Sequence, residues 1–225
     1  MGRGAGELPV QINMQEREIT MKVVYYGPAL SGKTTNLLQL HELISPSSRG
    51  KMVTLDTADD RTLYFDFLPI QFGTHNGFSV KIKLFTVPGQ VMHKSTRKVV
   101  LAGADAVAFV ADSQRASASA NAYSWRDMEA NLKSNGIDFD STPKVVQFNK
   151  RDLPDVKALN EIKAAWGDIP TFPAVAIKGE GVLESFRELL RLLYRSIDER
   201  HAFASKFGVS EEDFLKGIFQ NFSSS

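Results

Sequence analysis

The alternation of apolar and polar residues along the chain predicts strands and helices in turn. Short apolar runs indicate strands, and apolar residues that recur every three or four positions indicate helices. Several runs are apolar throughout, which is typical of strands covered on both faces of a sheet. Strands are predicted at residues 21–26, 52–55, 64–70, 78–84, 106–111, 144–148 and 172–177, and helices at 33–43, 125–132 and 182–197.

One pair of these strands should be antiparallel. His75, Asn76 and Gly77 form a hairpin signal between the third and fourth predicted strands. In the returning strand apolar residues alternate with Ser and Lys, so one of its faces should be exposed. The pattern predicts an α/β fold with a doubly wound, mostly parallel sheet of about six strands, one antiparallel edge hairpin and helices on both faces.

The length of 225 residues suits a single α/β domain with a tail at each end. Hydrophobic residues make up 43% of the chain and charged residues 24%, which is typical of a globular protein with a core. We expect an N-terminal extension with one short strand over residues 1–19, a domain over 20–200, and a C-terminal extension over 201–225.

The charge balance argues against some classes of partner. With 27 basic and 26 acidic residues the net charge is +1, which does not favour a nucleic acid or an anionic membrane. The absence of cysteine excludes disulfides and thiolate metal sites, and Gly6 stands where a myristoylation signal needs Ser or Thr. We expect a cytoplasmic protein without a direct membrane anchor, recruited to a membrane or cell pole by partners.

The segment from Gly27 to Thr34 fits the phosphate-loop pattern G-x-x-x-x-G-K-[ST], and it lies between a predicted strand and a predicted helix. Main-chain amides and the start of the helix would bind phosphates, Lys33 would reach the β- and γ-phosphates, and Thr34 would bind Mg²⁺. A plain connecting turn is the alternative, but it would not require Lys-Thr at its end. The residues expected to contact the nucleotide here are Gly27, Ala29, Leu30, Ser31, Gly32, Lys33, Thr34 and Thr35.

A second motif, Asn149-Lys150-Arg151-Asp152, follows the predicted strand 144–148. The Asp152 carboxylate can accept hydrogen bonds from N1–H and the exocyclic amine of guanine, a donor pair that adenine lacks. Asn149 can address N7, and the Lys150 stem can lie over the ring. Taken alone, the motif would indicate an Asx turn with a salt bridge. Together with the phosphate loop, it predicts binding of guanine nucleotides.

The phosphate loop, N-K-R-D and the turn Pro88-Gly89-Gln90 together resemble the Ras-like small GTPases, which have the P-loop NTPase fold. Longer strings resemble one branch of them, the bacterial MglA-type gliding-motility and polarity GTPases, over roughly residues 19–198. These strings are Tyr25-Tyr26-Gly27-Pro28, Gly32-Lys33-Thr34-Thr35-Asn36, Arg61-Thr62-Leu63, Phe65-Asp66-Phe67-Leu68-Pro69, Thr86-Val87-Pro88-Gly89-Gln90, Val110-Ala111-Asp112-Ser113-Gln114 and Gln147-Phe148-Asn149-Lys150-Arg151-Asp152-Leu153-Pro154.

The resemblance implies roles for individual residues. Thr62 would bind Mg²⁺ beside Thr34, and Arg61 would act with Lys33 in catalysis as an arginine finger supplied in cis. A solvated loop cation is the other interpretation of Arg61. Gln90 would orient the attacking water, the Gly89 N–H would contact the γ-phosphate, and Ala176 would donate its N–H to guanine O6.

By the same resemblance the protein would bind GTP or GDP with Mg²⁺ and hydrolyse GTP slowly without an activating protein. Its partners would be a roadblock-type GTPase-activating protein, an exchange factor, and effectors of motility or polarity. A guanine-nucleotide-bound scaffold or adaptor that hardly turns over is the alternative function. A P-loop kinase is disfavoured, because the sequence shows no second phosphate-acceptor site or basic lid.

Three positions affect this interpretation. Thr86 stands where most small GTPases have the aspartate that holds Mg²⁺ through water, so Mg²⁺ affinity should be weaker. Asp112 ends an apolar run, as does the metal-binding aspartate of P-loop ATPases, but we expect it to cap a loop instead. Ala29 replaces a usual glycine and places a methyl near the γ-phosphate, which predicts turnover at or below roughly 10⁻⁴ s⁻¹.

The C-terminal extension contains a predicted amphipathic helix. Ser210 followed by Glu211 to Asp213 resembles a helix cap with acids in its first turn. The apolar stripe beyond it would either pack on the domain's own surface or dock into a partner's groove. The stripe consists of Phe214, Leu215, Ile218, Phe219 and Phe222.

Overall fold

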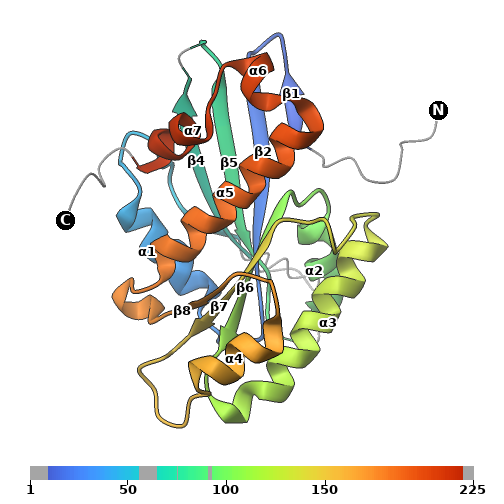
Figure 1. The fold of residues 1–225 in the computed structure, drawn as a ribbon, viewed down its shortest axis with the longest axis vertical. Coiled ribbons are helices and arrows are strands. Elements are labelled where there is room, and N and C mark those ends of the chain that lie inside the picture. Colours follow the sequence, from blue (N-terminus) through green and yellow to red (C-terminus); the bar gives the residue numbers. More distant parts are fainter. Residues whose placement is uncertain (1–9, 56–64, 75, 91–92, 220–225) are drawn as a thin grey trace.

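The computed structural model describes residues 10–55, 65–74, 76–90 and 93–219 (Figure 1). Its strands are β1 (Gln11–Asn13), β2 (Glu18–Tyr26), β3 (Val53–Leu55), β4 (Phe65–Gly73), β5 (Ser79–Thr86), β6 (Ala106–Asp112), β7 (Lys144–Asn149) and β8 (Thr171–Pro173). Its helices are α1 (Lys33–Leu43), α2 (Lys94–Leu101), α3 (Ala118–Ser134), α4 (Leu159–Trp166), α5 (Val182–His201), α6 (Phe203–Phe207) and α7 (Glu211–Phe219), and two short 3₁₀ turns lie at Arg115–Ser117 and Ala176–Lys178.

The described strands form one sheet in the order β3-β4-β5-β2-β6-β7-β8, with β1 paired to the start of β2. The strands from β5 to β8 pair in parallel, and β4 pairs antiparallel with β5 and β3. The predicted α/β class with a mostly parallel sheet and an antiparallel hairpin is therefore confirmed. The described residues form eight strands where about six were expected for the sheet; the short strands β1 and β3 lie at the N-terminal extension and at 52–55, where the pattern predicts strands.

The helices cover both faces of the sheet, as the pattern predicts. Successive residues of β2 point to opposite faces: Tyr25 belongs to the core cluster under α1 and α5, and Tyr26 to the cluster under α2, α3 and α4. Figure 1 shows α5 crossing the sheet in front, with α1 and α3 on opposite sides of it. The helices α2 and α4, of eight residues each, were not predicted as separate elements.

The C-terminal helices pack on the domain itself. Figure 1 shows α7 beside β4 and α5, and the side chains of Phe214 and Ile218 are fully buried there. The Phe214 ring lies 5.8 Å from that of Phe72 on β4 and 5.5 Å from that of Tyr194 on α5. Of the two interpretations of the apolar stripe, packing on the domain's own surface is confirmed for the described residues; Phe222 lies outside them.

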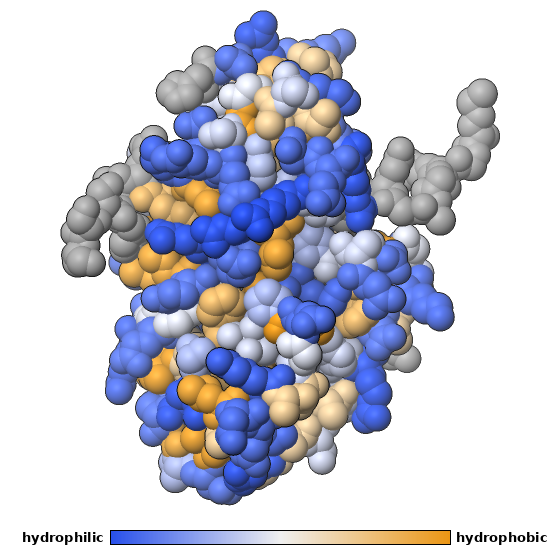
Figure 2. Space-filling view, in the orientation of Figure 1, coloured by the Kyte–Doolittle hydropathy of each residue, from blue (hydrophilic) through white to orange (hydrophobic). Residues whose placement is uncertain are grey.

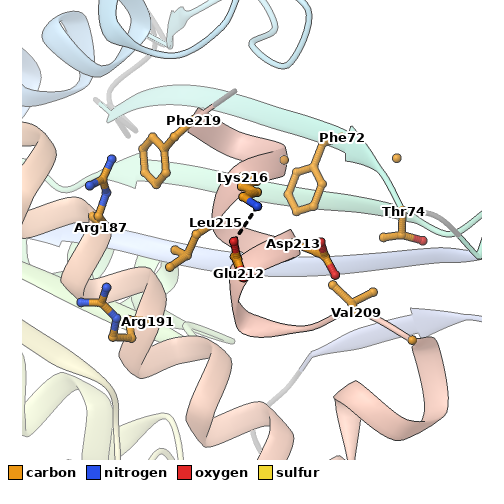
Figure 3. A pocket seen from close by; sticks show the side chains of 13 residues that line it. Phe72, Thr74, Arg187, Arg191, Val209, Glu212, Asp213, Leu215, Lys216 and Phe219 are labelled. Atoms are coloured by element: carbon orange, nitrogen blue, oxygen red, sulfur yellow. Dashed lines mark ion pairs between the residues drawn. The ribbon is translucent and has the colours of Figure 1, made fainter. Parts of the chain in front are cut away.

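A groove of about 520 Å³ lies between α7, α5 and the end of β4 (Figure 3). The Lys216–Glu212 ion pair of α7 lies at this groove, and Arg187 of α5 stacks over the ring of Phe219, 5.2 Å from its centre. Because β4 runs antiparallel to β5, this groove lies at the end of the sheet opposite the phosphate loop.

The surface over α5 is mostly hydrophilic, and Figure 2 shows its hydrophobic side chains in small separate groups. Among the described helices, none combines the length and the apolar character needed to cross a membrane.

A buried carboxylate joins β2 to the start of β6. Asp105 is 1% exposed, and its Oδ2 accepts a hydrogen bond of 2.6 Å from the main-chain N–H of Lys22. Its Oδ1 is buried and has no hydrogen-bond partner among the described residues. Burial raises the pKa of Asp105 to about 7, although the N–H and the charge of Lys22 act in the opposite direction. A protonated Asp105 is thus favoured by the fold.

Truncating Phe214 tests the packing of α7. The Phe214→Ala variant should lose about 3–5 kcal/mol of unfolding free energy, because the cavity would lie inside the main core. Urea denaturation followed by circular dichroism measures this change. The matched control is Lys216→Ala on the exposed face of α7, which should shift stability by no more than about 0.5 kcal/mol. Equal stability of the two variants would contradict the packing role.

Asp105 should make stability fall as pH rises. The folded chain binds this proton up to about pH 7, whereas an unfolded aspartate releases it near pH 4. Stability is therefore lost across that window, by at most about 4 kcal/mol. Asp105→Asn keeps an oxygen for the Lys22 N–H and removes the charge, so its stability relative to the parent should improve between pH 5 and pH 8.

Urea denaturation at pH 5 and pH 8 provides the measurement. The control is Asp138→Asn at an exposed carboxylate whose pKa is lowered by hydrogen bonds from Ser141. The Asp138 carboxyl affects stability only below about pH 4. Its replacement should therefore leave the difference in unfolding free energy between pH 5 and pH 8 the same as in the parent. An equal change of unfolding free energy between pH 5 and pH 8 in Asp105→Asn and in the parent would disprove the raised pKa of Asp105.

Candidate functional site

The candidate site lies where four parallel strands end. The ends of β2, β5, β6 and β7 meet at one edge of the sheet, and Asp112 of β6 stands directly opposite Asn149 of β7. Each strand leads into one of the loops that the sequence singles out. Ligands of open α/β sheets bind at this edge, beyond the carboxyl ends of the strands.

The phosphate loop joins β2 to α1 through a glycine, and any side chain at this position would be strained. Gly32 has φ +104°, and a Cβ on it would lie 2.2 Å from Nδ2 of Asn149. The first turn of α1 contains no acidic residue, and it opens with Lys33, Thr34 and Thr35. The amides at the start of α1 and its positive dipole end therefore suit an anion such as phosphate.

Lys33 lies inside the loop, with only 7% of its surface exposed. Its Nζ donates hydrogen bonds to the carbonyl oxygens of Gly27, at 3.0 Å, and Pro28, at 2.7 Å. Burial, reinforced by the charge of Arg97, lowers the pKa of Lys33 to about 7, and Asp66 acts in the opposite direction. The ammonium group is held at the loop by neutral carbonyl groups.

Asp66 on β4 is a site residue that the motif analysis did not select. It is 2% exposed, and its Oδ2 accepts hydrogen bonds from the hydroxyls of Thr34, at 2.6 Å, and Thr86, at 2.9 Å. Its Oδ1 accepts one from Thr54, at 2.9 Å. These are hard oxygen donors of the kind that Mg²⁺ prefers, so the donor set fits a magnesium ion.

A local signal could have revealed Asp66. Along β4 the buried positions alternate with less buried ones, and they are occupied by Asp66, Leu68, Ile70 and Phe72. A carboxylate in a stripe that is otherwise apolar needs partners or a ligand, because burying an isolated charge is costly.

The Pro88–Gln90 turn lies against the phosphate loop. A Cβ on Gly89 would stand 2.2 Å from the main-chain N of Ala29, so only glycine allows this approach. The side chain of Gln90 is exposed beside it. The two segments that should contact the γ-phosphate, at Ala29 and at Gly89, are therefore neighbours.

Asn149 connects three loops through one buried side chain. Its Nδ2 donates to the carbonyl oxygen of Ser31 at 2.8 Å, and its Oδ1 accepts from the N–H of Ala176 at 2.8 Å. It is 3% exposed. The amide of Ala176, expected to reach guanine O6, is thus bonded to Asn149, and it would have to share that hydrogen bond with a base.

Lys150 adopts φ +64°, a left-handed conformation unusual for a residue with a side chain. Its Nζ forms an ion pair of 2.8 Å with Oδ2 of Asp112. The Oδ1 of Asp112 accepts the N–H of Gln114 at 2.9 Å, so the expected loop-capping role of Asp112 is confirmed. Asp152 is exposed two residues further on.

The structure brings most of the predicted residues to one edge of the sheet. Leu30 of the phosphate loop is 89% exposed, and the half-buried Thr35 lies in the first turn of α1. The predictions for Arg61 and Thr62 lie outside the described residues. The arrangement offers main-chain amides and one lysine for phosphates, oxygen ligands for a hard cation, and an exposed carboxylate after β7.

Comparison with known proteins agrees with this geometry. No family model matches the chain. The chain is 44% identical over 184 residues to the Mutual gliding-motility protein MglA of Myxococcus xanthus (strain DK1622), and the match covers 81% of this chain and 94% of that protein.

Proposed function

The chain belongs to the MglA-type family of Ras-like small GTPases, and from this we propose that it is a molecular switch that binds GTP or GDP with Mg²⁺ and hydrolyses GTP slowly. One observation carries the proposal: the buried side chain of Asn149 holds the phosphate loop beside the N-K-R-D loop. A nucleotide that contacts both loops would place its phosphates at the first loop and its base at the second.

Lys33 and the start of α1 would bind the phosphates. Lys33 needs only to exchange its two carbonyl partners for phosphate oxygens. Thr34 and Asp66 would hold Mg²⁺, with Thr62 as a further ligand by family resemblance. When bound, Mg²⁺ would neutralise charge on the phosphates. Asp66 would supply the carboxylate that Thr86 lacks, since the two side chains are hydrogen-bonded to each other.

The base would be read by the loops after β7 and β8. Asp152 would accept the two donors on the guanine edge, and the Lys150 stem would lie over the ring. The ion pair with Asp112 supports this role, because it fixes the end of Lys150. Asn149 keeps a second N–H on Nδ2 for N7, and Ala176 would offer its N–H to O6.

Hydrolysis would depend on Gln90 to orient water, with Gly89 at the γ-phosphate and Arg61 as the arginine finger. Gly89 lies close to the main chain of Ala29, so the Ala29 methyl would take up part of the space that the γ-phosphate, Gln90 and Arg61 must share. This crowding is the proposed cause of slow turnover. In the switch, GTP would order these segments and hydrolysis would release them.

The cellular role follows by analogy with the relative, whose name assigns it to gliding motility. The protein would act in the cytoplasm on effectors of motility or polarity, under a roadblock-type activating protein and an exchange factor. The alternative is a GTP-bound scaffold that hardly turns over. The two differ in whether added activating protein makes hydrolysis fast.

Nucleotide release from purified protein tests the proposal directly, together with the Asp152→Asn variant. The parent should release GDP or GTP. In the variant an amide replaces the carboxylate, so one of the two guanine donors loses its acceptor oxygen and faces an NH2 donor instead. Affinity for GDP should fall at least about a hundredfold, and affinity for xanthosine diphosphate, which has an acceptor at C2, should rise.

Competition with ADP and omission of Mg²⁺ serve as controls for this measurement. Because Asp152 is exposed, the variant should keep the stability of the parent to within about 0.5 kcal/mol. A parent that prefers ATP, or that takes up no purine nucleotide with Mg²⁺ present, would refute the proposed function.

Replacing Ala29 by glycine tests the cause of slow turnover. The Ala29→Gly variant should hydrolyse bound GTP faster than the parent, by up to about a hundredfold, because an ångström of displacement can have that effect. Single-turnover release of the γ-phosphate measures the rate. Affinity for GDP serves as the internal control and should stay within about threefold. An unchanged rate would remove Ala29 as the cause.

A further inference from the structure

Four buried side chains join the phosphate loop to the Pro88–Gln90 turn. We call Tyr26, Arg97, Asp127 and Asn131 the Asp127 network, because Oδ2 of Asp127 accepts from the other three: Arg97 Nε at 2.7 Å, Tyr26 hydroxyl at 2.5 Å and Asn131 Nδ2 at 3.1 Å. Asn131 Nδ2 also donates to the Tyr26 hydroxyl at 3.1 Å. A single carboxylate oxygen thus holds groups from β2, α2 and α3.

The network is shielded from water. The side chains of Arg97 and Asp127 are 3% and 8% exposed, and Tyr26 is fully buried. Burial, together with the hydrogen bond to Asp127, raises the pKa of Tyr26, so its hydroxyl stays protonated and donates. Charge-assisted hydrogen bonds of this kind are short and directional when water is excluded. The guanidinium group is therefore fixed in orientation.

The far end of Arg97 contacts the turn on both sides of Gly89. Its Nη1 donates to the carbonyl oxygen of Gln90 and, at 3.5 Å, to that of Pro88. Gly89 itself lies against the main chain of Ala29. Arg97 thus holds the two peptide groups that flank the residue in contact with the phosphate loop.

The other end of the network reaches the same loop. Tyr26 is the last residue of β2, and Gly27 follows it as the first residue of the phosphate loop. Asp127 is therefore linked to the loop through Tyr26 and to the turn through Arg97. Movement of either segment relative to the other would have to break a buried, charge-assisted hydrogen bond.

We propose that Arg97 is a positioning residue for GTP hydrolysis: anchored by Asp127, it sets where the Gly89 N–H and the Gln90 side chain face the third phosphoryl group. The inference rests on the proposed function, because it gives Gln90 and Gly89 the roles assigned there. Arg97 acts through the main chain of the turn. Its planar fork matters as much as its charge, since lysine cannot reproduce the same set of fixed donors.

A purely structural ion pair is the alternative to a positioning role. Such a pair would support GDP and GTP binding equally, because both need the same folded loop. A positioning role concerns the third phosphate alone, since the Pro88–Gln90 turn faces that position. The two roles therefore differ in the ratio between GDP affinity and the rate at which bound GTP is hydrolysed.

The test compares Arg97→Lys with the parent in single-turnover GTP hydrolysis and in GDP binding. We expect hydrolysis ten- to a hundredfold slower, as for a displaced catalytic group. Affinity for GDP should stay within about threefold, and affinity for a non-hydrolysable GTP analogue should fall more than that for GDP. The matched control is Arg195→Lys on α5, whose ion pair with Glu211 lies on the surface; it should change none of these values.

Tyr26→Phe is the second variant, because it keeps the ring and removes only the hydroxyl from Asp127. It should also slow hydrolysis, but by a smaller factor than Arg97→Lys, because Asp127 keeps its hydrogen bonds with Arg97 and Asn131. An unchanged rate in Arg97→Lys, or an equal loss of GDP affinity and hydrolysis in both variants, would overturn the proposal.

Hydrogen exchange separates this proposal from the proposed function, because it needs no nucleotide. The N–H of Val87 is bonded to Tyr25 and that of His93 to Gln90, one on each side of the turn. Both amides should exchange faster in Arg97→Lys than in the parent and in Arg195→Lys. A parent that binds no guanine nucleotide would refute the proposed function, whereas unchanged exchange would refute the positioning role.

Discussion

The candidate site depends on one buried amide, the side chain of Asn149. Its two polar atoms are hydrogen-bonded to the main chain of Ser31 and of Ala176. Ser31 lies more than a hundred positions away in sequence, and Ala176 fewer than thirty. Loops of this kind connect strands over the surface and have few contacts of their own. A buried side chain with both its groups satisfied gives them one fixed arrangement. Without it, the phosphate loop and the N-K-R-D loop would lose the side chain that joins them directly.

Asp66 performs a comparable role on the other side of the site. It accepts hydrogen bonds from hydroxyl groups on α1, β3 and β5. A single carboxylate thus joins three elements at the point where phosphates would lie. In most small GTPases the carboxylate stands on the strand that ends here at Thr86. In this chain the carboxylate stands on β4, and Thr86 is its hydrogen-bond partner. A carboxylate thus lies beside Thr86 although it stands on another strand, because the antiparallel pairing of β4 with β5 brings both positions together.

The features that the sequence predicts are those with a local cause. The phosphate loop, the 33–43 helix and the 78–84 strand follow from spacing and alternation over a few residues, and the structure has them at those positions. Asp66 has a local signal too, as a carboxylate in a buried stripe. The link from Tyr26 to Asp127 has none, because it joins residues 101 positions apart and depends on how α3 packs on the sheet. The short α4 was missed because eight residues give too little periodicity to distinguish a helix from a loop.

The charges at the phosphate loop are incompletely neutralised, and this bears on what the site binds. Within the described part of the chain, the hydrogen-bond partners of Lys33 Nζ are two carbonyl oxygens, which carry partial charges, and burial and the nearby charge of Arg97 lower the pKa of Lys33. Asp66, the acid that acts on Lys33, shares its oxygens among three hydroxyl groups. A buried lysine without a full negative charge as hydrogen-bond partner is costly to the fold, and phosphate oxygens in place of the carbonyl groups would stabilise it. The amides at the start of α1 would offer further donors to the same anion. The electrostatics around Lys33 therefore agree with the phosphate ligand proposed for this loop.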